Sequence, residues 1–239
     1  KLAHVQHRTD QVFEAVSGSR MMCNYFRFGG VSRDMPDYLL DKVRDLVFER
    51  LSRKVDDLET YVTHNEIVRY RCEGIGVLTP EQAIAYSTVG PVQRASGVPY
   101  DLRSADPYSI YDRFDFDVAV RYHGDVYDRY LVRIDEIRQS IRILEQVLRD
   151  IPAGPIQEGK PQYAVRVPAG EAYGRVEGPK GELGFYVVSN GKTNPWRYHV
   201  RAPSFINLSP LSVMSKGSKI ADAVVILGSI DIVLGETDR

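Results

Sequence analysis

Two long stretches of the sequence have the apolar spacing of amphipathic helices. In the first, an apolar residue recurs every three or four positions: Leu40, Val43, Val47, Leu51, Val55, Leu58 and Val62. The second stretch runs from Asp125 to Arg149, and its apolar stripe consists of Tyr130, Ile134, Ile137, Ile141, Leu144 and Leu148. Residues at this spacing share one face of a helix, so we predict two long helices that each bury one face.

Shorter helices are indicated beside these two. Thr9 to Val16 is predicted to be helical, and Gly18 follows where a helix can close. Thr79-Pro80-Glu81-Gln82 is a capping box, which predicts a short helix through Tyr86. From Val89 to Asp112 several glycines and prolines break the pattern, so we expect an irregular segment with a functional or binding role.

The segment from Arg20 to Val31 has neither a helical nor an alternating period, and it is rich in aromatic residues and methionine. Gly29-Gly30 permits a tight turn or a close approach to another backbone. Two interpretations stay open, a loop packed over the core or a wall of an interface or pocket.

After Gly154 the pattern changes to short β-type runs separated by turn residues. These runs cover residues 163–167, 172–177, 183–188 and 196–201, and Asn190-Gly191 is a strong hairpin signal. We predict a small antiparallel sheet of three or four strands, followed by helices over 204–214 and 219–227. The fold class is therefore α+β and mainly helical. We divide the chain into a helical region (1–153), the sheet (154–203) and C-terminal helices with a tail (204–239), within one domain.

The last twenty residues, Ile220 to Arg239, are apolar almost to the end of the chain and then become charged. Chain ends are usually polar and frayed, so this one is unusual. It is either a helix that docks on the core or the lining of a pocket.

Composition narrows the function classes. The 239 residues are 43% hydrophobic and 26% charged, as in ordinary globular proteins, and a net charge of −1 gives no general attraction to nucleic acid. No apolar run is long enough to predict a membrane span. Cys23 and Cys72 are isolated, which indicates a reducing compartment and argues against a cysteine-bound metal. Nucleotide-binding, zinc-protease and serine-hydrolase motifs are absent, so the residues alone favour a binding or assembly component over a self-contained enzyme.

Several motifs together resemble one family. They are Ser17-Gly18-Ser19-Arg20-Met21, Gly90-Pro91-Val92-Gln93-Arg94, Gly124-Asp125-Val126-Tyr127-Asp128-Arg129-Tyr130, Pro179-Lys180-Gly181-Glu182 and Asp231-Ile232-Val233-Leu234-Gly235-Glu236-Thr237-Asp238-Arg239. In this order they resemble the hydrogenase-large-subunit-like chain (the D chain) of complex I, the proton-pumping NADH–quinone oxidoreductase. The resemblance covers nearly the whole sequence. It implies a fold like that of the [NiFe] hydrogenase large subunit, but Asp231 stands where a nickel site would need its C-terminal cysteine pair.

The resemblance implies a peripheral-arm subunit on the cytoplasmic side of the cell membrane, with no cofactor of its own. Its implied partners are an iron–sulfur subunit that carries the terminal [4Fe-4S] cluster, other peripheral-arm subunits and membrane-arm subunits. The two facing subunits would enclose a chamber for quinone, the substrate. Nucleic acid is not among the expected partners.

Site residues follow from the same resemblance. Val233 and Asp238 match positions of the quinone pocket, whereas Met22 and Arg27 match positions near the partner's cluster. Many relatives have a histidine where Met22 stands here. The histidine and tyrosine that hold the quinone head group belong to an N-terminal part of the family that this chain lacks, so we expect no catalytic and no metal-binding residue here.

The chain begins at Lys1 and its first methionine is Met21, so we expect a C-terminal fragment that is inactive when isolated. Two alternatives stay open. The same subunit could serve a ferredoxin- or F420-linked quinone or phenazine oxidoreductase, or the isolated chain could be only a scaffold.

Overall fold

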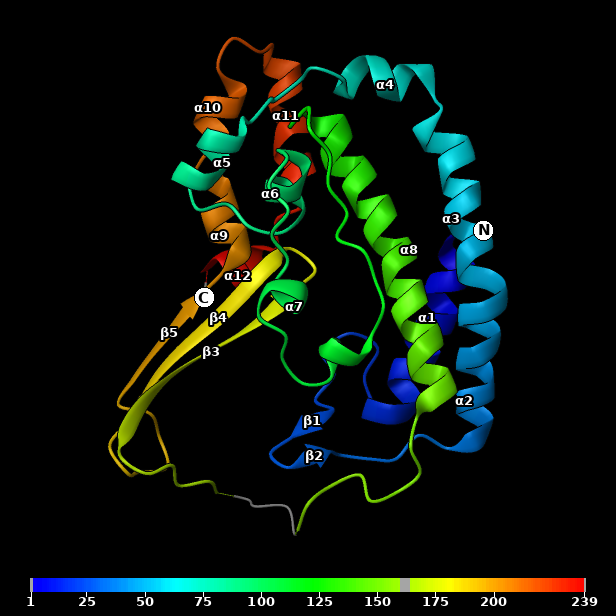
Figure 1. Ribbon diagram of the computed structural model, residues 1–239, viewed down its shortest axis with the longest axis vertical. Helices are drawn as coiled ribbons and strands as arrows, with labels where there is room; N and C mark the ends of the chain where they lie inside the picture. Colours follow the sequence, from blue (N-terminus) through cyan, green and yellow to red (C-terminus); the bar gives the residue numbers. More distant parts are fainter. Residues whose placement is uncertain (1, 160–163, 239) are drawn as a thin grey trace. The chain divides into compact units, whose positions relative to one another are not determined.

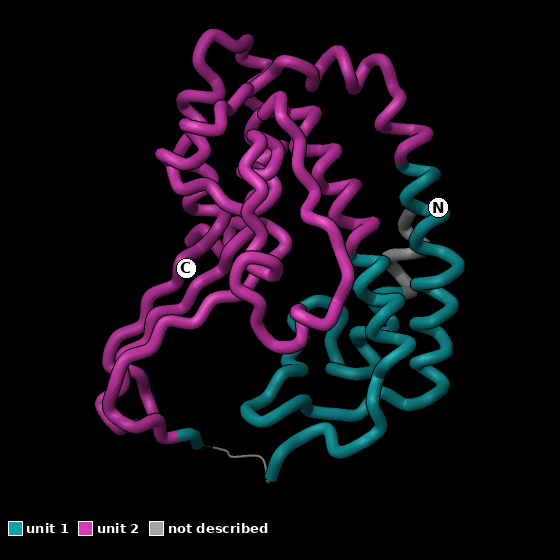
Figure 2. Tube along the Cα trace, in the orientation of Figure 1, with its two compact units in different colours: residues 1–58, 140–165 teal, residues 59–139, 166–239 magenta. Residues whose placement is uncertain are grey.

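The computed structural model describes residues 2–159 and 164–238, and the chain forms two compact units (Figure 2). Unit 1 comprises residues 1–58 and 140–165, and unit 2 comprises residues 59–139 and 166–239. Each unit has its own buried residues, so each is described by itself.

Unit 1 is mainly helical. It contains α1 (Leu2–Ser17), α2 (Asp37–Arg44), the π-helical turn η1 (Asp45–Leu51), α3 (Ser52–Leu58) and the end of α8 (Val126–Asp150). The two predicted long helices are confirmed, although the first contains π-helical turns, here η1 and in unit 2 η2 (Glu59–Thr63). Its buried apolar side chains are Val16, Leu39, Leu46, Val47, Val55, Ile141, Ile143 and Leu148.

A two-stranded hairpin in unit 1, β1 (Phe26–Arg27) and β2 (Gly30–Val31), lies in the segment expected to be a loop. Gly30 has φ +151°, and a Cβ there would lie 2.1 Å from the carbonyl oxygen of Ile156. The backbone N–H of Val31 donates to that same oxygen over 3.0 Å. The glycine pair therefore permits close backbone approach, as its sequence predicted.

Unit 2 holds most of the short helices (Figure 1). They are α4 (Glu66–Cys72), α5 (Pro80–Ala85), α6 (Pro91–Ala95), α7 (Leu102–Ala105), the 3-10 turn η3 (Tyr111–Arg113), α9 (Pro203–Leu208), α10 (Leu211–Ser215), α11 (Ile220–Ile230) and α12 (Leu234–Asp238). The capping box of Thr79 and Gln82 is present as predicted. The irregular structure expected between Val89 and Asp112 is wrong in part, because α6, α7 and η3 form there.

The sheet of unit 2 has three antiparallel strands in the order β3 (Gly170–Gly178), β4 (Gly181–Ser189) and β5 (Arg197–Arg201). Residues 164–167 form no strand, which corrects the first predicted run as far as its residues are described. A tight turn at Pro179-Lys180 joins β3 to β4, and residues 190–196 join β4 to β5.

The two faces of this sheet differ in charge. Successive side chains of a strand alternate between faces, so Arg175, Glu177, Glu182 and Arg201 share one face. The opposite face carries only uncharged side chains, among them Val176, Phe185, Val187, Tyr198 and Val200. The charged face contacts the short helices of unit 2 through ion pairs described below.

The C-terminal helix α11 lies in the core of unit 2. Ile226 and Ile230 are fully buried, in a cluster with Leu78, Ala83, Val92, Val126 and Met214. The interpretation of a helix docked on the core is thus correct for α11. Among the described helices, none combines the length and the apolarity needed to cross a membrane.

A buried arginine fastens α11 to the start of α8. The guanidinium group of Arg129 donates hydrogen bonds of 2.9 Å to the carbonyl oxygens of Gly76 and Gly124 and to Oγ of Ser229. Burial lowers the pKa of Arg129 to about 10, which leaves the group charged at neutral pH.

Candidate functional site

The tail leaves the core at Asp231, which adopts a left-handed conformation with φ +59°. Its backbone N–H donates to the carbonyl oxygen of Gly228 over 3.1 Å and so closes α11. The chain therefore turns sharply here, and Ile232 to Leu234 lead into α12.

Asp231 accepts contacts from two basic side chains. The ammonium group of Lys180, at the turn between β3 and β4, forms an ion pair with its carboxylate. Nε of Arg133, on α8, lies 3.9 Å from the same carboxylate, and Arg133 also donates to the carbonyl oxygen of Ile230 over 3.3 Å. Burial lowers the pKa of Arg133, and Asp231 opposes that effect. Two cations meet one carboxylate, so this group, the tail cluster, carries one excess positive charge.

The turn that carries Lys180 is held in place by its backbone. Nδ2 of Asn207 donates to the carbonyl oxygens of Val89 (3.1 Å) and Lys180 (3.2 Å), while its Oδ1 accepts the N–H of Val89 over 2.9 Å. A Cβ at Gly90 would lie 2.5 Å from the Lys180 carbonyl oxygen, so only glycine permits this approach.

The tail itself is anchored on α9, which lies beside α12 (Figure 1). The Glu236 carboxylate accepts hydrogen bonds of 3.0 Å from the backbone N–H and the hydroxyl of Ser204. The N–H of Val233 donates to Oγ of Ser204 over 3.2 Å. These bonds leave the side chains of Val233 and Leu234 exposed by 44% and 73%, and Asp238 is exposed too.

The other two predicted site residues belong to unit 1. Met22 is 86% exposed. Arg27 donates from its guanidinium group to the carbonyl oxygens of Asn24 (2.9 Å) and Phe26 (3.1 Å), which fixes its side chain on the β1–β2 hairpin. Asn24, Phe26, Arg27 and Phe28 line a surface hollow of about 590 Å³. Exposed phenylalanines around a fixed arginine are typical of a surface that binds another protein.

Sequence reasoning missed the basic residues of the tail cluster and the anchor formed by Ser204 and Glu236. A signal for Lys180 exists, since the turn Gly178-Pro179-Lys180-Gly181 places one charged residue at the tip of a tight hairpin. Nothing local predicts that Arg133 meets Asp231.

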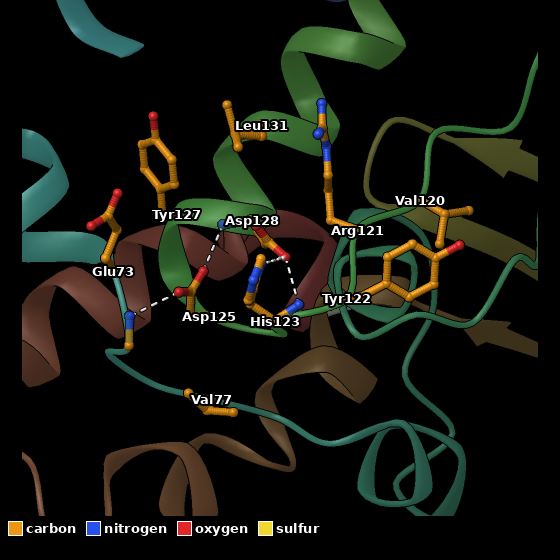
Figure 3. A pocket seen from close by; sticks show the side chains of 11 residues that line it. Glu73, Val77, Val120, Arg121, Tyr122, His123, Asp125, Tyr127, Asp128 and Leu131 are labelled. Carbon is orange, nitrogen blue, oxygen red and sulfur yellow. Dashed lines mark hydrogen bonds and ion pairs between the residues drawn. The ribbon is translucent and has the colours of Figure 1, made fainter. Parts of the chain in front are cut away.

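A cavity of about 660 Å³ lies beside the first turns of α8 in unit 2 (Figure 3). His123 and the carboxylate of Asp128 are paired in it, with Asp128 Oδ2 2.7 Å from the His123 backbone nitrogen and 3.1 Å from Nδ1. Val77, Tyr122 and Leu131 contribute apolar surface. The carboxylate of Asp125 accepts the backbone N–H of Asp128 over 2.7 Å and so caps the start of α8, while the carboxylate of Asp128 holds His123, so both already have a structural role.

Across residues 2–159 and 164–238, no group of three or more potential metal ligands occurs. Cys23 and Cys72 are both free thiols.

Comparison with known proteins gives a direct family match. The family described as "Respiratory-chain NADH dehydrogenase, 49 Kd subunit" matches residues 4–166 and 162–239. The chain is 55% identical over 236 residues to a D chain of the NADH-quinone oxidoreductase of Roseiflexus sp. (strain RS-1), which covers 95% of this chain and 63% of that protein. It is 56% identical over 231 residues to a D chain of the NADH-quinone oxidoreductase of Herpetosiphon aurantiacus, covering 95% of this chain and 62% of that protein.

A third relative, the corresponding NADH-quinone oxidoreductase chain of Dehalococcoides mccartyi (strain 195), is 52% identical over 229 residues, covering 96% of this chain and 62% of that protein. The chain thus spans 62–63% of the length of these relatives. The family match extends over almost every residue, and the chain therefore belongs to the 49 kDa subunit family of respiratory-chain NADH dehydrogenases.

Proposed function

We propose that this chain is part of a peripheral-arm subunit of a respiratory NADH–quinone oxidoreductase, and that its tail forms one wall of the quinone chamber. The family match over residues 4–166 and 162–239 is the observation that carries the proposal. Quinone is the substrate, and the relatives' names support it. A core like that of the [NiFe] hydrogenase large subunit is part of this proposal, supported by the sequence resemblance.

The tail has the chemistry that a quinone needs. Val233 and Leu234 present apolar surface for the ring and its hydrocarbon chain, and Asp238 supplies a polar contact at the end of α12. The ammonium group of Lys180, held by Asp231, provides a donor for an oxygen that gains negative charge during reduction. Glu236 and Ser204 hold the wall in place.

The exposed loop of unit 1 has a different proposed role. Met22 and Arg27 would face an iron–sulfur partner subunit that carries the terminal [4Fe-4S] cluster, which supplies electrons when bound. The positive charge of Arg27 would favour the reduced, more negative state of a nearby cluster. Other peripheral-arm and membrane-arm subunits complete the proposed assembly on the cytoplasmic side of the membrane.

Kinetics of the complete complex test this proposal. We expect Asp231→Asn and Lys180→Met to lower kcat/KM for quinone by about 10-fold or more, because Lys180→Met removes the proposed donor and Asp231→Asn removes the carboxylate that holds it. Reduction of an artificial acceptor such as ferricyanide, which takes electrons upstream, should stay unchanged in both variants. Fully assembled variants that reduce quinone at the normal rate would contradict the proposed wall.

A further inference from the structure

The charged face of the sheet is buried against one arginine. Arg94, on α6, is 2% exposed, and its guanidinium nitrogens lie 2.6 Å from Glu136, 3.0 Å from Glu177 and 3.7 Å from Asp101. The side chains of Glu177 and Asp101 are 4% and 1% exposed. Arg103 adds a second cation through its 2.6 Å ion pair with Asp101. Three carboxylates thus share two guanidinium groups; Arg94, Glu177 and Asp101 are buried, whereas the side chains of Glu136 and Arg103 are 18% and 16% exposed.

A second layer of charges does not remove the imbalance. Glu182 lies 3.5 Å from Arg175 and 3.8 Å from Arg201, and Arg175 also pairs with Asp106 at 2.7 Å. Within the described part of the chain, the ion pairs of both layers join five carboxylates to four guanidinium groups, together called the Arg94 network. Its members are Asp101, Asp106, Glu136, Glu177 and Glu182 with Arg94, Arg103, Arg175 and Arg201. Arg133, one turn before Glu136 on α8, forms its ion pair with Asp231, and the charge of Glu136 also opposes the lowering of its pKa by burial. Counted over the ion pairs of the two layers alone, the network has one more negative than positive charge when every group is ionised.

The position of the excess charge follows from the strand register. Glu177 and Glu182 are direct partners across β3 and β4, and their side chains lie on the same face. Like charges opposite each other in a sheet destabilise it. Glu182 has two hydroxyl donors, Tyr100 at 3.2 Å and Tyr173 at 3.4 Å, besides its arginines. Glu182 thus has two guanidinium groups and two hydroxyl groups around its carboxylate, whereas Glu177 pairs with Arg94 at 3.0 Å, which it shares with two other carboxylates.

Among the described residues, the carboxylate of Glu177 has only a long hydrogen bond besides Arg94. Oε2 accepts the backbone N–H of Leu102, on α7, over a long 3.3 Å, and the hydroxyl of Tyr108 binds the Glu177 backbone N–H. Burial raises the pKa of Glu177, Asp101 raises it further, and Arg94 acts in the opposite direction. The pKa of Asp101 is lowered by Arg103 and Arg94, although burial raises it.

We propose that Glu177 is a reversible proton-binding site of the folded chain, and that the proton it holds neutralises the excess charge of the Arg94 network. A buried group of interacting carboxylates binds such a proton because that costs less free energy than burying an unpaired charge. All the interacting carboxylates of the network influence the pH at which this proton is released, and the carboxyl group that carries it is that of Glu177.

The site lies close in sequence to the tail cluster. Glu177 is the second-last residue of β3, next to the turn that carries Lys180, and Lys180 pairs with Asp231. Release of the proton adds one negative charge at the base of this turn. Quinone reduction takes up two electrons and two protons, so the proton held by Glu177 would be available to that reaction. This role rests on the proposed function, whereas the proton site itself does not.

Infrared titration of the complete complex, without quinone or electron donor, tests the proton site. The C=O band of a protonated carboxyl group is separate from the carboxylate bands. We expect such a band to persist above the pH at which ordinary carboxyl groups are ionised and to disappear as the pH rises further. Glu177→Gln should remove one carboxyl equivalent of this band. Glu171→Gln is the matched control, since Glu171 lies exposed on the same strand and face, and it should leave the band intact.

An unchanged band in Glu177→Gln, or no such band in the unmodified complex, overturns the proposal. If Glu177→Gln does not assemble, Glu177→Asp replaces it. Aspartate keeps a titratable carboxyl group but moves it, so the band must shift in frequency or in its midpoint pH, and an unshifted band counts against Glu177. Because no quinone is present, failure here contradicts the proton site alone, whereas normal quinone kinetics in the tail variants contradict the proposed function alone.

Discussion

The ammonium group of Lys180 contacts the carboxylate of Asp231, although the two residues are 51 positions apart in the chain. This ion pair joins the hairpin turn of the sheet to the point where the tail leaves α11. It also places the excess positive charge of the tail cluster next to the turn whose base holds Glu177. The Arg94 network, through Glu177, and the tail cluster, through Lys180, thus meet at one tight turn.

The proton site predicts a pH dependence of stability. A folded-state pKa of Glu177 above its unfolded value means that the folded chain binds more protons in that interval. The free energy of unfolding contributed by this group is then fully present below the unfolded pKa and falls as the pH rises through the folded pKa. Urea unfolding of Glu177→Gln should lack this decline, so the variant gains stability relative to the unmodified chain as the pH increases. A constant difference between the two chains across this range would contradict the prediction.

Arg129 should be one of the strongest polar contributors to the stability of unit 2. Lysine keeps the charge but offers a single nitrogen, so Arg129→Lys cannot reproduce all three hydrogen bonds of the guanidinium group, and the carbonyl oxygen of Gly76 depends on one of them. We expect the free energy of unfolding to fall by about 3 kcal/mol. The exposed Arg113→Lys is the control and should change it by less than about 0.5 kcal/mol. Equal stability of the two variants would show that the hydrogen bonds of Arg129 contribute little.

Gly30 and Gly18 form a matched pair for the hairpin of unit 1. Alanine at Gly30 would collide with the Ile156 carbonyl oxygen, whereas alanine at Gly18, with φ +79°, meets no atom within 4 Å. Gly18→Ala should cost about 1 kcal/mol from its backbone conformation alone. We expect Gly30→Ala to cost clearly more and to make residues 20–31 easier to cleave by protease. Similar protease sensitivity in both variants would argue against the close approach of these backbones.

The anchor of the tail can be tested apart from its chemistry. Glu236→Gln removes the charge and one of the two acceptor oxygens that bind Ser204, so we expect a local loss of about 1–2 kcal/mol. Hydrogen exchange of residues 232–238 should become faster while the core of unit 2 keeps its protection. Asp238→Asn, which removes a negative charge at an exposed position of the same helix, should leave this exchange unchanged. If exchange becomes equally fast in Asp238→Asn, the loss of a negative charge from α12 explains the effect, and the hydrogen bonds to Ser204 do not.

The proposed place of Met22 beside the partner's cluster gives an electrochemical prediction. A thioether takes up no proton, so the reduction potential of that cluster should depend little on pH. Met22→His supplies a titratable group and should steepen the slope towards about 59 mV per pH unit, the value for one proton per electron. Potentiometry of the assembled complex measures this, and a steep slope already present with Met22 would refute the assignment.

Local sequence signals predicted much of this fold. The apolar stripe from Tyr130 to Leu148 became α8, and the Thr79 capping box became the start of α5. The apolar residues of α11 predicted a core helix, because Ile226 and Ile230 lie one turn apart and are both buried. These elements depend on spacing within a few turns, which the sequence displays directly.

Other features depend on contacts distant in sequence. Helix α6 has only five residues, and it forms because Gly90 permits close contact with the turn at Lys180 while Arg94 is held by three carboxylates from other elements. Composition made that segment resemble a loop. The tail cluster was missed for the same reason, since α8, α11 and the β3–β4 turn supply one charged group each.

The central claim is that the tail from Asp231 to Asp238 lines the quinone site of the complete complex. Photoaffinity labelling with a quinone analogue that carries its reactive group on the ring, followed by peptide mapping, tests this most directly. We predict a labelled peptide that contains Val233 and Leu234, and we expect excess unmodified quinone to suppress the labelling. Suppressible labelling that falls entirely on other peptides would contradict the account.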